Sequence, residues 1–103
     1  MTDRLFKFLD RDGSCRYAPG QRWSLPRDDG PGDWMPPIEG ELRHRNAYHV
    51  FRGCDVLLWS GQALFEVEGR GDLVLLPSQI LLREARLLRQ VPLEEIPRLF
   101  REQ

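Results

Sequence analysis

Alternation of apolar and polar residues predicts β-strands in three places, over residues 4–9, 46–52 and 63–69. In the first of these, Phe6 and Phe8 share one face, and the leucines on either side of them share the other. A strand with apolar groups on both faces is expected to be central in its sheet or covered on both sides. These segments form the predicted core.

The strand over 46–52 holds the most varied chemistry. Tyr48 and Val50 point to one of its faces, whereas His49 and Phe51 point to the other. In the next strand, two glutamates alternate with apolar residues, which predicts one face against the core and one in water.

The remaining segments predict turns and helices. Residues 69–71, Gly-Arg-Gly, indicate a turn, and 73–77 a short apolar strand or a segment tucked under the sheet. Taken alone, the apolar periodicity of 79–91 favours a helix. Short helices are also predicted near 55–60, after a capping aspartate, and near 93–101, after a proline.

Residues 26–42 predict a long surface loop, because they hold four prolines and three glycines. From residue 28 to residue 42 there are five acids and no base. Trp34 and Met35 lie in its middle, so they either fold back as a satellite cluster or anchor a partner protein.

Length and charge narrow the class of protein. The chain has 103 residues, the size of one domain, and a net charge of −1, which favours neither nucleic acid nor anionic membrane. Nearly all its cations are arginine, and Lys7 is its only lysine. The start of the chain lacks an apolar leader, and no apolar run approaches a membrane span, so a cytoplasmic protein is expected.

Metal and cofactor motifs are weak. Cys15 and Cys54 lie too far apart to make a zinc pattern. The run at 10–14 begins like a calcium loop but departs from that motif at its fifth and twelfth positions. No serine nucleophile elbow or phosphate-binding glycine loop is present. No cofactor and no metal are therefore predicted.

Several short motifs resemble, in their order along most of the chain, a family of small uncharacterised bacterial and phage domains. They are Phe6-Lys7-Phe8, Cys15-Arg16-Tyr17, Gly20 with Trp23, Ala47 to Phe51, Asp55-Val56 through Trp59, Phe65 to Glu68, and Ala85 to Val91. Where the family has a glycine and a cysteine, this chain has Ala47 and Phe51. The resemblance implies a strand at 80–90, against the helical periodicity, and implies no function.

His49 is the main candidate for chemistry, as a general base, a ligand or a structural histidine bonded to a loop. If the first turn packs beside its strand, Arg16 could join His49 and Tyr48 in binding a phosphate or carboxylate. An enzyme resembling the ADP-ribosyl-transferring folds would need a catalytic glutamate motif, which is not evident. His44, five positions before His49, is expected on the opposite face of a continuous strand and not in a shared metal site.

Arg43, Arg45 and Arg52 with Tyr48 could bind nucleic acid, as could the arginines at 83, 86 and 89. Interleaved glutamates and the acidic loop argue instead for a salt-bridged surface.

The sequence predicts one α+β domain over 1–103, with a mainly antiparallel sheet, strands near 4–9, 46–52, 63–69 and 80–90, and helices near 55–60 and 92–103. The leading functional hypothesis is a non-enzymatic protein-binding or adaptor module, which acts through the Trp34 loop or a strand edge and can form a homodimer. The alternatives are a nucleotide or phosphate binder centred on His49 and Arg16, and a nucleic-acid binder.

Overall fold

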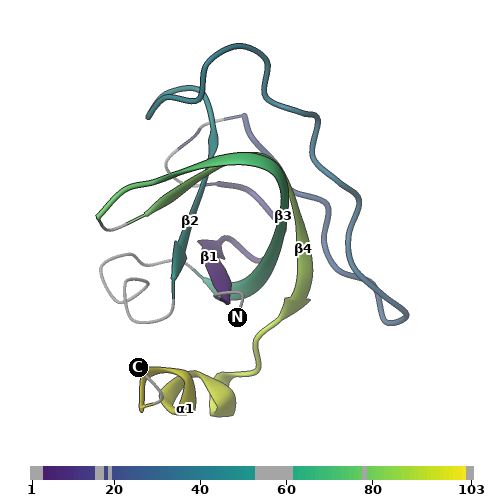
Figure 1. Ribbon diagram of the computed structural model, residues 1–103. Coiled ribbons are helices and arrows are strands. Elements are labelled where there is room, and N and C mark those ends of the chain that lie inside the picture. Colours follow the sequence, from purple (N-terminus) through teal and green to yellow (C-terminus); the bar gives the residue numbers. More distant parts are fainter. Residues whose placement is uncertain (1–3, 16–17, 19, 53–61, 78, 102–103) are drawn as a thin grey trace.

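Four antiparallel strands close into a small barrel in the computed structural model (Figure 1). The structure describes residues 4–15, 18, 20–52, 62–77 and 79–101. The strands are β1 (Leu5–Leu9), β2 (Tyr48–Arg52), β3 (Ala63–Leu75) and β4 (Ile80–Gln90), and their order around the barrel is β1-β2-β4-β3. A strand lies at each of the four predicted places, but β3 continues six residues beyond its predicted end at residue 69.

The predicted α+β class is wrong, because nearly all the regular structure is sheet. Helix is confined to a 3-10 turn, η2 (Leu93–Glu95), and to α1 (Ile96–Arg101), at the position predicted for the C-terminal helix. The helix predicted at 55–60 lies outside the described residues. Neither helical segment in the described part of the chain is long enough, or apolar enough, to cross a membrane.

The helical periodicity at 79–91 was misleading, and the strand implied by the family resemblance is correct. This segment is β4, which pairs with β2 on one side and with β3 on the other. Its inward residues, such as Leu82, Ala85 and Leu87, are buried, and three arginines are among the other positions, but Leu81 is buried as well. A register shift between Glu66 and Val67 of β3 breaks the strict alternation. The run therefore imitates a helix.

The predicted turn at 69–71 is also wrong, since β3 runs through it as one strand of 13 residues. A second register shift lies between Arg70 and Leu73, and Gly71 adopts a φ of 80° there. A Cβ on Gly69 would lie 2.9 Å from the methyl carbons of Leu82. The two glycines thus permit a bulge and a close approach, so the strand bends without reversing.

The predicted loop at 26–42 forms no regular element, but it follows β4 closely, as Figure 1 shows. Backbone amides of Gly32, Met35 and Ile38 donate to the carbonyl oxygens of Leu87, Ala85 and Arg83, at 2.9, 2.8 and 2.9 Å. The loop therefore provides hydrogen bonds to the edge of β4 beyond Leu82, where pairing with β2 stops, as an additional strand would.

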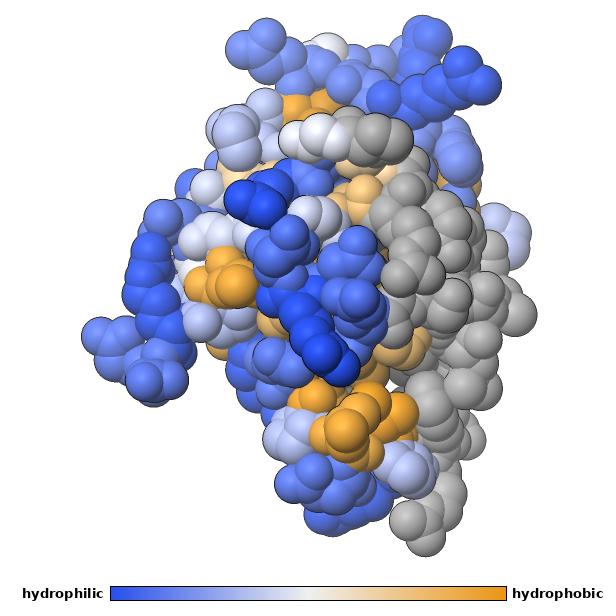
Figure 2. All heavy atoms as spheres, turned by 180° about the vertical axis from the view of Figure 1, so that it is seen from behind, coloured by the Kyte–Doolittle hydropathy of each residue, from blue (hydrophilic) through white to orange (hydrophobic). Residues whose placement is uncertain are grey.

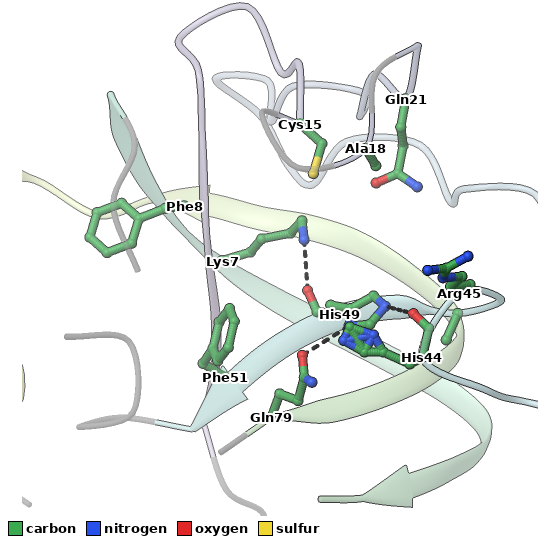
Figure 3. Close-up of a pocket in the computed structure, with 11 residues that line it drawn as sticks. Lys7, Phe8, Cys15, Ala18, Gln21, His44, Arg45, His49, Phe51 and Gln79 are labelled. Carbon is green, nitrogen blue, oxygen red and sulfur yellow. Dashed lines mark hydrogen bonds between the residues drawn. The ribbon is translucent and has the colours of Figure 1, made fainter. Parts of the chain in front are cut away.

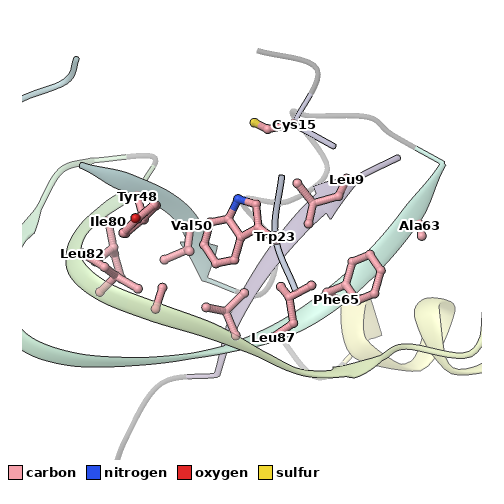
Figure 4. Close-up of a cluster of buried hydrophobic side chains, with 12 residues drawn as sticks. Leu9, Cys15, Trp23, Tyr48, Val50, Ala63, Phe65, Ile80, Leu82 and Leu87 are labelled. Atoms are coloured by element: carbon pink, nitrogen blue, oxygen red, sulfur yellow. The ribbon is translucent and has the colours of Figure 1, made fainter. Parts of the chain in front are cut away.

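Trp23 fills the centre of the barrel, although it comes from the loop after β1 (Figure 4). Its side chain is 1% exposed, and its ring meets Tyr48 edge-to-face with 5.2 Å between centroids. Its backbone N–H donates to the carbonyl of Gly13 at 2.8 Å. A smaller cluster around Phe6, Phe51, Leu64 and Val91 packs against the other face of β1, so the two-faced prediction for this strand is confirmed.

Gly13 and Gly20 make a matched pair for testing the Trp23 connection. Both have a positive φ, 90° and 87°, but a Cβ on Gly13 would collide with the Trp23 carbonyl oxygen, whereas one on Gly20 meets no atom of the described residues within 4 Å. Gly20→Ala should cost roughly 1–2 kcal/mol of unfolding free energy through backbone strain alone. Gly13→Ala should cost about 3–4 kcal/mol, because the Trp23 backbone must also move. Urea unfolding measures both, and equal losses would contradict this account.

Candidate functional site

A pocket of about 430 Å³ opens between the start of β2 and the loop that follows β1 (Figure 3). Its volume falls in the range of sites for small molecules. The described residues that line it are Lys7, Phe8, Cys15, Ala18, Gln21, His44, Arg45, Ala47, His49, Phe51 and Gln79. None of these is acidic, and four of them carry basic groups.

Lys7 is the least expected member of this lining. Alternation along β1 places it on the same face as Leu5 and Leu9, and it is only 6% exposed. Its Nζ donates to the carbonyl of His49 at 2.7 Å and lies 5.5 Å from the centre of the Trp23 ring. Figure 3 shows the amine and the Cys15 sulfur directed into the same space.

Burial lowers the pKa of Lys7 below its ordinary value, and the neighbouring Cys15 opposes that shift only in part. The unprotonated amine is a nucleophile, whereas an ordinary lysine at neutral pH is not. A buried lysine without a carboxylate among its described neighbours works against folding, so it is a candidate functional group.

His49 is half-buried, and both of its ring nitrogens are engaged. Nε2 lies 2.5 Å from the carbonyl oxygen of His44, which can only accept, so Nε2 carries a proton. Nδ1 lies 2.9 Å from Oε1 of Gln79. The ring cannot act as a base or a metal ligand without giving up one of these bonds. Through these contacts His49 joins the turn at His44 to Gln79.

The expectation that His44 lies on the opposite face from His49 is wrong. Residues 43–46 form a turn closed by hydrogen bonds between Arg43 and Asn46, and β2 begins only at residue 48. The two imidazoles therefore meet edge-to-face, with 4.9 Å between their centroids. Within the described residues, no three His, Cys, Asp or Glu side chains lie close enough to share a metal ion.

The other candidates for ligand and partner binding are buried, contact the outer surface of the barrel, or lie outside the described residues. Tyr48 is buried, and its hydroxyl donates to the carbonyl of Pro36 at 2.5 Å, so its ring offers no face to a ligand. The Trp34 ring is contacted by the guanidinium groups of Arg70 and Arg86, which lie 3.9 and 4.7 Å from its centre. Met35 packs against the barrel core. The predicted partner Arg16 falls outside the described residues.

The salt-bridged surface predicted for the arginines is confirmed along β3 and β4. Glu66, Glu68 and Arg70 lie opposite Arg89, Arg86 and Glu84 in the strand register, and each opposed pair is an ion pair. Burial alone would raise the pKa of Glu66, but hydrogen bonds from Arg4 and Arg89 hold it below its ordinary value. Arg83 likewise pairs with Asp72. Arginines already bound to acids offer little to a phosphate backbone.

The three arginines suggested for nucleic-acid binding near β2 differ in position. Arg43 is exposed and paired with Glu41 at 2.7 Å, outside the pocket, whereas Arg45 is exposed and lines it. Arg52 is half-buried at the end of β2. The pocket therefore contains two predicted residues, His49 and Arg45, together with Lys7, Gln21 and Gln79, which sequence analysis missed. Alternation puts Lys7 on the same face of β1 as Leu5 and Leu9, and that was the available signal.

Comparison of the chain with protein-family models, curated proteins and solved structures finds no match. The resemblance drawn from its sequence motifs stays a prediction.

Replacing Lys7 tests its state directly through the pH dependence of stability. Between the lowered pKa of folded Lys7 and its ordinary value in the unfolded chain, the unfolded chain binds more protons, so stability rises with pH. We expect Lys7→Met to gain stability over the unmodified protein as pH falls from 9.5 towards 6, by at most about 1.4 kcal/mol per pH unit. Urea unfolding across this range measures the difference. A difference that does not change with pH would contradict a lowered pKa.

Proposed function

We propose that this domain binds a small anionic molecule in the Lys7 pocket, without turning it over. One observation carries the proposal: the described lining of a ligand-sized cavity has four basic side chains and no carboxylate. The amide groups of Gln21 and Gln79 add donors that can orient a carboxylate or phosphate.

Arg45 and His44 are exposed, whereas Lys7 lies deep in the cavity. An anion would therefore meet Arg45 and His44 at the mouth before it reached the buried amine. An anion next to Lys7 would also favour its protonated form, so that binding draws in a proton. The nucleotide or phosphate binder expected from the sequence was centred on His49 and Arg16, whereas Lys7 and Arg45 are the central residues here.

Arg45 and Arg43 supply a matched test, because both are exposed arginines on the same turn and only Arg45 lines the pocket. Calorimetric titration with inorganic phosphate, acetate and lactate should show saturable binding of at least one of them. Arg45→Gln should weaken that binding roughly tenfold, through loss of a charge-assisted hydrogen bond.

Arg43→Gln should leave the affinity unchanged. Equal losses in the two variants would indicate general surface electrostatics, and the absence of binding by every anion would overturn the proposal.

We also propose that the domain binds protein, as the leading sequence hypothesis expected, and that it does so through the free edge of β3. Residues 70–75 are all exposed, and they include the apolar run Leu73, Val74 and Leu75. Within the described chain, β1 pairs with β3 only between Ala63 and Val67, so no strand covers the far side of 70–75. An exposed apolar edge is a template for strand pairing. Seen from behind relative to Figure 1, the surface shows hydrophobic side chains only in separate patches among hydrophilic ones (Figure 2).

We expect the occupant of this edge to be β3 of a second copy, in antiparallel pairing. Light scattering after size exclusion should then show a dimer that Leu75→Lys converts to monomer. Leu93→Lys is the control, because Leu93 is exposed on η2 instead. A monomer at the highest attainable concentration would rule the pairing out.

A further inference from the structure

The buried amine of Lys7 suggests what the anionic ligand carries besides its charge. We propose that the pocket takes a small 2-oxo acid, whose carbonyl carbon condenses with Lys7 Nζ to form a reversible imine. This inference rests on the proposed function, since Arg45 and its neighbours would hold the carboxylate while Lys7 meets the carbonyl.

The first argument is the surroundings of the amine. Lys7 is 6% exposed, its amine donates to the backbone carbonyl of His49, and the centre of the Trp23 ring lies 5.5 Å from its Nζ. An amine that donates one hydrogen to the His49 carbonyl and meets no carboxylate of the described lining keeps its lone pair available in the neutral form. Nucleophilic lysines are activated by this kind of desolvation.

The second argument is that the two ends of the pocket carry different groups. The buried end holds the amine, and the open end holds Arg45 and His44, with the amides of Gln21 and Gln79 also in the lining (Figure 3). A 2-oxo acid has the same division, because its electrophilic carbon is bonded directly to a carboxylate. Arginine and amide donors suit the carboxylate, whereas a neutral amine suits the carbonyl.

The proposed step balances without an oxidant or reductant. The Nζ lone pair forms a bond to the carbonyl carbon, and the carbonyl π electrons move to oxygen, which takes up a proton as nitrogen loses one. The resulting carbinolamine expels water, and nitrogen gives up its second proton. The products are an imine and one molecule of water, and the reverse reaction restores the free amine.

Because Lys7 is the only lysine, trapping can be assigned to it without ambiguity. The full chain is incubated at pH 7 with glyoxylate and cyanoborohydride, which reduces an imine to a stable secondary amine. Peptide mapping by mass spectrometry then separates a carboxymethyl adduct on Lys7 from one on the N-terminal amine. The result expected is an adduct on Lys7, and in Lys7→Met an adduct only at the terminus.

An Arg43→Lys variant carries an ordinary exposed amine as an internal reference on the same chain. At pH 7 we expect Lys7 to be trapped faster than the amine at position 43, by on the order of tenfold. In the described lining, the other groups that titrate or carry charge, and so can affect the Lys7 amine, are Cys15, His44, Arg45 and His49. A slower reaction at Lys7 than at position 43 would overturn the inference.

The carboxylate requirement is tested with propionaldehyde, which has a carbonyl and no charge. Arg45→Gln should slow trapping of subsaturating glyoxylate roughly tenfold and leave trapping of propionaldehyde unchanged. Equal effects on both reagents would overturn the assignment to 2-oxo acids.

Failure of this inference can be told from failure of the proposed function. Acetate and lactate have no reactive carbonyl, so their binding reports on the anion site alone. If they bind and Lys7 forms no adduct, the imine is excluded while anion binding stands. If Lys7 forms an adduct but no anion binds or competes, the anion site is excluded and the 2-oxo acid with it.

Discussion

The burial of Trp23 is the contact on which both the barrel and its pocket depend. Two of the strands have only five residues, and the space they enclose is filled by an indole from the loop between β1 and β2. Removal of a buried tryptophan commonly costs about 3–5 kcal/mol, whereas an exposed ion pair contributes at most about 1 kcal/mol. The same ring packs on Tyr48 and lies beneath the Lys7 amine, so core and pocket share one wall.

Burial of the Lys7 amine destabilises the fold but gives the pocket a reactive group. An apolar residue at this position would pack against Trp23 without the cost of desolvating an amine. The structure offsets part of that cost with one hydrogen bond to the His49 carbonyl, and His49 is in turn held by His44 and Gln79. The backbone of β2 and its histidine thus position the amine, and His49 contributes as a support for the site.

The charged residues act mainly on the outside of the barrel. Strand register brings each glutamate of β3 opposite an arginine of β4, and the Trp34 ring contacts Arg70 of β3 and Arg86 of β4. This network attaches the 26–42 loop to the sheet and leaves these arginines engaged. The pocket differs, because its described basic groups have no carboxylate beside them. That contrast separates a structural arginine from a candidate ligand-binding one, although both look alike in the sequence.

Local pattern determined the strands, their faces and the irregular loop, because alternation along a strand depends only on neighbouring residues. It placed Lys7 on the same face of β1 as Leu5 and Leu9, but only the structure showed that this lysine is buried. It could not decide between helix and strand at 79–91, since a register shift imitates helical periodicity, nor between a turn and a bulge at Gly69 and Gly71. Only the tertiary structure closed the sheet into a barrel and brought Arg45 and Gln21 around the Lys7 amine, because those contacts join residues far apart in the chain.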